Sequence, residues 1–156
     1  MSKIAWFKNY LQEVQSTIIL NGATPINSNR MVIDDSQLTK HLSEHQSDHN
    51  FLLVGVLPDF GSSGTNGDNF KLSASTQFMI LEKTSYSEVN YDEFYDIFDR
   101  AFEVVELVLQ KLLNDHLSGG CGYLRFLNPQ SIQVVPVWNK SSCNGWNITF
   151  SFDTPL

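Results

Sequence analysis

The strongest structural signal in the sequence is residues 90–117, which read NYDEFYDIFDRAFEVVELVLQKLLNDHL. Apolar residues recur there at steps of three and four, the spacing that places them on one face of an α-helix. The recurring positions are Tyr91, Phe94, Phe98, Ala101, Val105, Val108 and Leu112, widened by Phe102, Leu109 and Leu113. Gly119 and Gly120 favour a helix end directly afterwards. The pattern predicts one long amphipathic helix that packs on another layer.

Two segments before this helix predict the first hairpin of a sheet. Residues 50–58 contain an apolar run that suits a buried strand, and residues 72–82 alternate apolar and polar positions. The residues between them, 61–69, are only Gly, Ser, Thr, Asn and Asp, so they are predicted to form the hairpin tip. Residues 25–29, earlier in the chain, are predicted to be turn and loop.

Residues 131–138 and 146–152 predict a second hairpin after the long helix. Apolar and polar residues alternate along the second of these segments. The loop that joins them is predicted to include Asn144 and Gly145. Pro136 lacks a backbone N–H, so its strand is predicted to be an edge strand or to contain a bulge.

Two short helices are predicted near the N-terminus. Residues 3–14 carry apolar residues at helical spacing, and Ser2 can act as the N-cap. Asp34 and Asp35 can cap a second helix that runs to about residue 47.

The elements together predict an α+β fold. It comprises a mostly antiparallel sheet of about four strands, one long helix packed on a face, and the short N-terminal helices. The sequence shows no internal repeat and no linker long enough to divide it, so residues 1–156 are predicted to form a single domain.

The negative charge of the chain is concentrated in the long helix. The 156 residues include 17 acidic and 10 basic ones, a formal net charge of −7. At about 100° per residue, five acids project from one side, opposite the apolar stripe. They are Asp92, Asp96, Asp99, Glu103 and Glu106. This acidic stripe is either a solvated face, a surface for a basic partner, or a wall that repels passing DNA.

Composition excludes several classes of function. A net-acidic chain without a Lys/Arg cluster is a poor candidate for binding nucleic-acid phosphates. No apolar run approaches the roughly 18 residues of a membrane span, so no membrane partner is predicted. The N-terminal residues lack a signal-peptide core, which predicts synthesis and retention in a cytoplasm. Cys121 and Cys143 are then expected to be free thiols.

One short motif offers a catalytic alternative. Residues 41–45 read HLSEH, the spacing by which some zinc peptidases place two imidazoles and a carboxylate on one helix face. A zinc-dependent hydrolase would use His41 and His45 as ligands and Glu44 as base. His49 lies about 12 Å from His41 along a helix, too far to share one ion with it, and no third ligand is evident. The favoured interpretation is a polar, partly exposed helix, and no metal or cofactor is predicted.

The element order resembles that of small tail-completion, tail-terminator and head–tail connector proteins of tailed phages. The residues that carry the resemblance are the ending NGWNITFSF, residues 144–152, and the start of the long helix, YDEF, residues 91–94. The resemblance implies a non-enzymatic subunit that forms a ring, often a hexamer, at the end of a tail tube or in the neck. DNA would pass through its lumen, and Gly145 and Trp146 would be structural residues.

The leading prediction is therefore a structural virion protein of the phage tail or neck, made in the host cytoplasm. It would self-associate as a ring and dock onto tail-tube or connector subunits. The alternatives are the zinc hydrolase and an interaction module that receives a basic partner on the acidic stripe. The predicted contact residues lie in the first helix and the first hairpin tip. They are Trp6, Gly61, Ser62, Ser63, Gly64, Thr65, Asn66 and Gly67.

Overall fold

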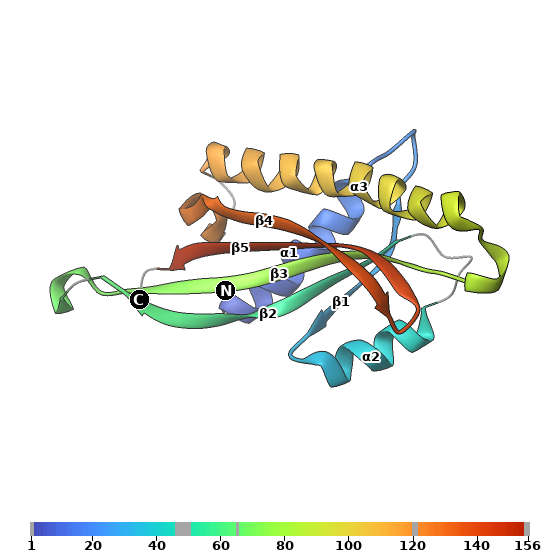
Figure 1. Ribbon diagram of the computed structural model, residues 1–156. Helices are drawn as coiled ribbons and strands as arrows, with labels where there is room; N and C mark the ends of the chain where they lie inside the picture. The colour runs from blue at the N-terminus through green and yellow to red at the C-terminus, as the bar shows by residue number, and fades with distance from the viewer. Residues whose placement is uncertain (1, 46–50, 65, 120–121, 155–156) are drawn as a thin grey trace.

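A computed structural model describes residues 2–45, 51–64, 66–119 and 122–154 of the 156-residue chain. Five strands form one sheet in the order β1-β2-β3-β5-β4 (Figure 1). The strands are β1 (Ile26–Val32), β2 (Phe51–Ser63), β3 (Lys71–Lys83), β4 (Leu127–Lys140) and β5 (Cys143–Thr154). The helices are α1 (Lys3–Thr17), α2 (Asp35–Glu44) and α3 (Tyr91–Ser118), with short 3₁₀ turns at Gly67–Asn69, Tyr86–Glu88 and Gly122–Phe126. The predicted α+β fold is confirmed.

The long helix α3 begins and ends where the sequence indicates. The Glu93 N–H donates to Asn90 Oδ1 over 2.9 Å, and the Asn90 N–H donates to Glu93 Oε2 over 3.2 Å, which is a capping box. Gly119 ends the helix in the left-handed region, with φ of 66°. The fully buried face lies slightly to one side of the predicted stripe. It consists of Ile97, Ala101, Val104, Val105, Val108 and Leu112.

The main core lies between the sheet and the two helices α1 and α3. Phe7 of α1, Phe78 of β3 and Phe150 of β5 are buried there, in ring contact from one to the next. The hydroxyl of Tyr10 donates to Asp115 Oδ2 over 2.7 Å, so the first helix is joined to the end of the third. Ser2 caps α1 as predicted, since its Oγ accepts from the Ala5 N–H.

An ion-pair cluster strengthens the α1–α3 contact. The ammonium of Lys111 lies 2.7 Å from Glu13 and 3.0 Å from Asp115. Burial alone would lower the pKa of Lys111, but hydrogen bonds to the two carboxylates more than offset it and raise the pKa. The lysine therefore stays charged at the junction of the two helices.

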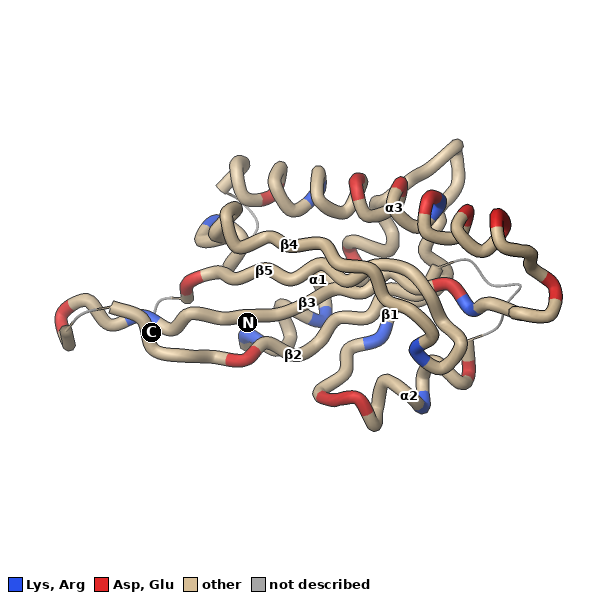
Figure 2. The backbone as a smooth tube through the Cα atoms, in the orientation of Figure 1, with Lys and Arg blue, Asp and Glu red and all other residues tan. Residues whose placement is uncertain are grey.

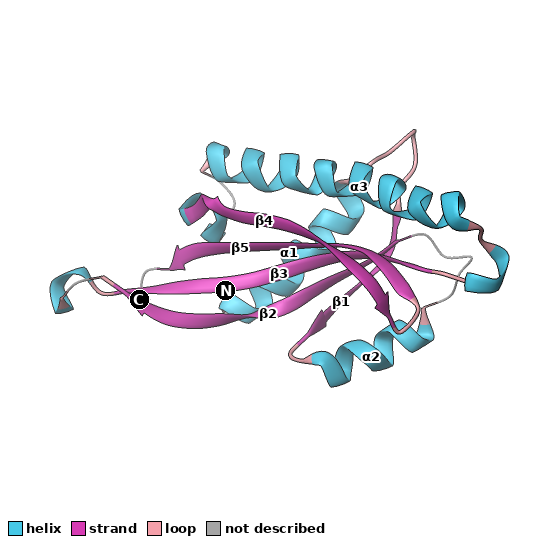
Figure 3. Cartoon of the chain, in the orientation of Figure 1, coloured by secondary structure: helices cyan, strands magenta, loops and turns pink. Residues whose placement is uncertain are grey.

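The short helix α2 packs on a second, smaller core. Its Leu38 and Leu42 are buried with side chains of β1, β2 and β3, and with Cys143 of β5. Figure 3 shows α2 beside the end of β1, apart from the long helix α3. Burial raises the pKa of the Cys143 thiol to about 11, although Lys83 nearby opposes the shift. Cys143 is therefore a neutral core side chain.

The strand β1 corrects one sequence prediction. Residues 25–29 are not a loop, because Ile26–Val32 runs parallel to β2 at the sheet edge. Only Ile26 and Val32, its first and last residues, are buried, and the residues between them are mainly polar. Because most of its residues are polar, β1 lacks the pattern of apolar residues by which a strand is recognised in a sequence.

The second hairpin differs from the prediction at its turn. Asn144 and Gly145 lie inside β5, and the turn consists of Ser141 and Ser142 in positive-φ conformations. Asn144 is fully buried and donates to Thr84 Oγ1 over 2.9 Å. Its side-chain oxygen accepts from the Asn139 N–H over 2.8 Å. Asn144 therefore stabilises the hairpin turn from a position inside β5, although an Asn-Gly pair usually forms the turn itself. β4 is an edge strand, as Pro136 predicted.

Candidate interaction surfaces

Six side chains from three elements line an open aromatic groove at one end of the molecule. They are Phe94, Tyr95 and Phe98 of α3, Pro136 and Trp138 of β4, and Trp146 of β5. Pro136 and Trp146 are paired across β4 and β5, and the first turns of α3 cross above them. Trp138 is 73% exposed and Tyr95 is 51% exposed. Exposed aromatic side chains gathered in one groove are typical of a protein contact surface.

The floor of the aromatic groove is held by contacts between α3 and β5. The indole Nε1 of Trp146 donates to the backbone carbonyl of Phe98 over 2.9 Å. The Trp146 ring also meets the Phe102 ring edge-on, with centroids 5.0 Å apart. Two elements distant in sequence therefore hold the groove in one shape, which lowers the entropy lost when a partner binds.

The acidic stripe runs beside the aromatic groove along the solvent side of α3. All five of its carboxylates are exposed, and Figure 2 shows acidic positions in succession along the first half of the helix. Within the described residues none of the five forms an ion pair, because Arg100 pairs with Glu82 and Lys111 with Glu13 and Asp115. Asp92 and Asp99 stand three and four residues from Tyr95, so they border the groove directly.

The hairpin tip is shorter than the predicted residues 61–69, because β2 extends into them. Gly61, Ser62 and Ser63 belong to β2, and β3 begins at Lys71. Asn66 caps the 3₁₀ turn that follows, accepting from the N–H groups of Asp68 and Asn69, and Gly67 begins that turn. Thr65 lies outside the described residues.

Gly64 makes the turn at the tip of this hairpin possible. Its φ is +105°, and a Cβ at this position would lie 1.9 Å from the Asn69 carbonyl oxygen. The end of the hairpin, residues 60–64 and 66–72, projects past the helices as an arm (Figure 1). The described residues of the predicted tip therefore belong to this projection, whose turn has a defined geometry.

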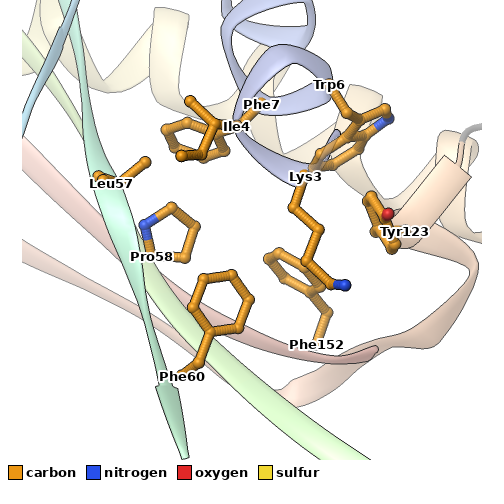
Figure 4. Close-up of a pocket in the computed structure, with 9 residues that line it drawn as sticks. All are labelled: Lys3, Ile4, Trp6, Phe7, Leu57, Pro58, Phe60, Tyr123 and Phe152. Carbon is orange, nitrogen blue, oxygen red and sulfur yellow. The ribbon is translucent and has the colours of Figure 1, made fainter. Parts of the chain in front are cut away.

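A second apolar surface lies at the base of the arm (Figure 4). Its lining combines the start of α1, the middle of β2, and two aromatic rings from the end of the chain. The residues are Lys3, Ile4, Trp6, Phe7, Leu57, Pro58, Phe60, Tyr123 and Phe152. Ile4 is 52% exposed and Phe60 is 43% exposed. Lys3, whose ammonium lies 5.7 Å from the Tyr123 ring centroid, is the one charged residue among the described lining residues.

Trp6, the first predicted contact residue, is half-buried at this surface. It stacks on Tyr10 with centroids 5.4 Å apart and meets Tyr123 edge-on at 5.2 Å. Trp6 therefore forms the inner wall of the surface, while Ile4 and Phe60 provide its exposed part.

The two apolar surfaces lie at opposite ends of the sheet. Ala74 of β3 pairs with Phe60 and Phe152, at the base of the arm. Ile80, six residues later on the same strand, pairs with Trp146 in the groove floor. At roughly 3.3 Å per residue, the two surfaces are separated by about 20 Å.

The histidine motif lies in a third, polar pocket between α2 and β1. His41, Glu44 and His45 line it together with Asn27, Ser28, Arg30 and Leu52. His45 is buried, and the buried Nδ1 of His41 has no hydrogen-bond partner among the residues that the structure describes. Among the described residues no three His, Cys, Asp or Glu side chains are grouped to hold a metal. His49 lies outside the described residues.

Comparisons with protein-family models, curated proteins and solved structures found no match. None of the helices in the described residues is long and apolar enough to cross a membrane. The interpretation of these surfaces therefore rests on their geometry and on the resemblance in element order.

Sequence reasoning did not identify the aromatic groove as a site. Tyr91, Phe94, Tyr95 and Phe98 share one face of the helix, a spacing that by itself predicts burial in the core. Tyr91 is 76% exposed. What the sequence lacks is the pairing that brings Pro136 and Trp146 beneath these rings.

Proposed function

We propose that this chain is a non-enzymatic structural subunit of a tailed-phage tail or neck. It self-associates as a ring and docks onto tail-tube or connector subunits, so its final location is the virion. DNA passes through the lumen of the ring without sequence-specific contacts.

The observation that carries the proposal is the pair of unlike apolar surfaces at opposite ends of the sheet. A subunit that joins one surface to a different surface of its neighbour makes a heterologous contact, which generates a ring when the rotation between copies closes. The aromatic groove and the base of the arm are such a pair. Their described lining residues are mainly aromatic and aliphatic, which suits protein contact.

The phage assignment is supported by one of the two segments that carry the resemblance, residues 144–152. Gly145 packs so tightly against β3 that a Cβ would lie 1.9 Å from the Ile80 carbonyl oxygen. Trp146 holds α3 through the Phe98 carbonyl. Both residues that the resemblance names as structural therefore occupy positions that a substitution would disturb.

Sedimentation velocity over a wide concentration range, with and without candidate tail-tube and connector subunits, tests the proposal. We expect a discrete oligomer or a stable complex, and we expect mass spectrometry of purified virions to detect the chain. A protein that stays strictly monomeric at high concentration and in the presence of tube subunits would contradict it.

A further inference from the structure

We propose that the aromatic groove of one copy binds the arm face of a second copy in a head-to-tail contact. The arm face is defined as Lys3, Ile4, Phe60 and Phe70. The inference rests on the proposed function and deepens it, because it assigns both sides of the contact within the oligomer.

The arm face and the groove are both apolar surfaces left open to water. Phe60 and Phe70 are each 43% exposed on the arm, and Ile4 is 52% exposed at its base. In the groove, Trp138 and Tyr95 are more than half exposed. Contact between the two surfaces would remove large aromatic side chains from water on both sides, which is the main favourable term in association.

The charges around the two surfaces are complementary. Asp92 and Asp99 border the groove, Asp96 lies between them on the acidic stripe, and all three are without an ion pair within the described residues. On the arm side, Lys3 lies over the Tyr123 ring and likewise forms no ion pair with a described residue. Opposite charges that are unpaired within a subunit are free to pair between subunits.

The acidic residues near the arm do not cancel this complementarity. Asp59 and Asp153 pair with Ser75 and Ser73 of β3, whose side chains alternate with that of the buried Ala74. The two carboxylates therefore project from the opposite face of the sheet. Asp68 lies in the turn at the tip of the arm.

One chain cannot satisfy its own groove with its own arm. The two surfaces lie about 20 Å apart along β3, and the strands between them are paired in a continuous sheet. The arm projects away from the groove (Figure 1). The proposed contact therefore joins two copies. The copy that contributes its groove keeps a free arm, and the copy that contributes its arm keeps a free groove, so further copies can add at both ends.

Two double variants and their mixture test the contact. The groove variant carries Tyr95→Ser and Trp138→Ser, and the arm variant carries Ile4→Ser and Phe60→Ser. These side chains are largely exposed, so both variants should keep the circular dichroism spectrum and unfolding midpoint of the parent. Each variant alone should be monomeric in sedimentation equilibrium. An equimolar mixture should form dimers and nothing larger, because only one intact groove meets one intact arm.

Several outcomes would overturn the inference without touching the proposed function. The inference fails if either variant oligomerises as the parent does, or if the mixture stays monomeric. It also fails if the parent is monomeric alone and uses the groove to bind a tail-tube subunit. A parent that neither self-associates nor binds tube subunits would overturn the proposed function itself.

A charge-neutralised variant tests whether the acidic residues beside the groove contribute to the contact between copies. Added salt should weaken association of the parent, because it screens charges at the contact. Replacing Asp92, Asp96 and Asp99 by Asn should reduce this salt dependence at least twofold. The matched control, Glu103→Gln with Glu106→Gln, removes stripe charges one to two turns away and should keep it. Equal effects of the two variants would overturn the assignment of the contact to the groove end.

Discussion

The indole Nε1 of Trp146 donates a hydrogen bond to the backbone carbonyl of Phe98, over 2.9 Å. This bond joins β5, in the second hairpin, to a residue of α3 that lies 48 positions earlier in the chain. It also fixes the floor of the aromatic groove, so the stability of the fold and the shape of the surface depend on one side chain.

Trp146→Phe should lower the free energy of unfolding by about 1–2 kcal/mol. The substitution removes the indole donor and part of the ring that packs on Phe102. Urea denaturation measures the change. Trp138→Phe is the matched control, since Trp138 is 73% exposed, and its effect should lie within about 0.5 kcal/mol of zero.

Gly145→Ala should lower the free energy of unfolding by roughly 3 kcal/mol. A Cβ at residue 145 would lie 1.9 Å from the Ile80 carbonyl oxygen, so the pairing of β5 with β3 must shift. Gly61→Ala is the control, because a Cβ there meets no atom within 4 Å. Equal urea midpoints for the two variants would contradict the register of β5.

Cys143 should be inert to thiol reagents in the folded protein. Burial raises its pKa to about 11, so at pH 8 almost none of it is the reactive thiolate. In a Cys121→Ser background, the reaction with DTNB should be slow in buffer and immediate in denaturant. Fast reaction of the folded protein would show that Cys143 is accessible.

The raised pKa of Cys143 also predicts that the stability of the fold depends on pH. The unfolded chain loses the thiol proton near the ordinary pKa of 9.0, whereas the folded chain keeps it up to about pH 11. Deprotonation therefore favours the unfolded state, and the contribution of Cys143 to stability should fall between these two pH values. Cys143→Ala should abolish that part of the pH dependence.

Purified protein should contain far less than one zinc per chain by elemental analysis. His41, Glu44 and His45 share a pocket, but the described residues provide no third ligand grouped with them. About one tightly held zinc per chain, lost in His41→Ala, would contradict this prediction and favour the hydrolase.

The elements with strong periodicity were predictable from the sequence, and those without it were not. The helix α3 has both an apolar stripe and a capping pair, Asn90 and Glu93, so its bounds follow from local chemistry. The strand β1 has polar residues along most of its length and gains its place from pairing with β2. Asn144 was misassigned to a turn because its buried partner Thr84 lies 60 residues away.

The interaction surfaces were only partly predictable, for the same physical reason. The acidic stripe is a property of one helix, so its five members follow from a 100° rotation per residue. The aromatic groove is a property of three elements, and nothing in the local sequence places Trp138 beside Tyr95. The sequence predicts Trp6 as a contact residue, but it does not show that the Trp6 ring stacks on Tyr10 in the folded protein.

The strand order has a consequence for synthesis on the ribosome. β5 follows all the other strands in sequence, yet it lies between β3 and β4 in the sheet. Until β5 has been synthesised, β4 has no partner strand and β3 has an open edge. The hydrogen bond from Tyr10 of α1 also requires Asp115, which lies 105 residues later. Such high contact order slows folding and delays completion of the sheet until β5 has been synthesised. The nascent chain therefore exposes unpaired strand edges up to that point, which favours binding by chaperones.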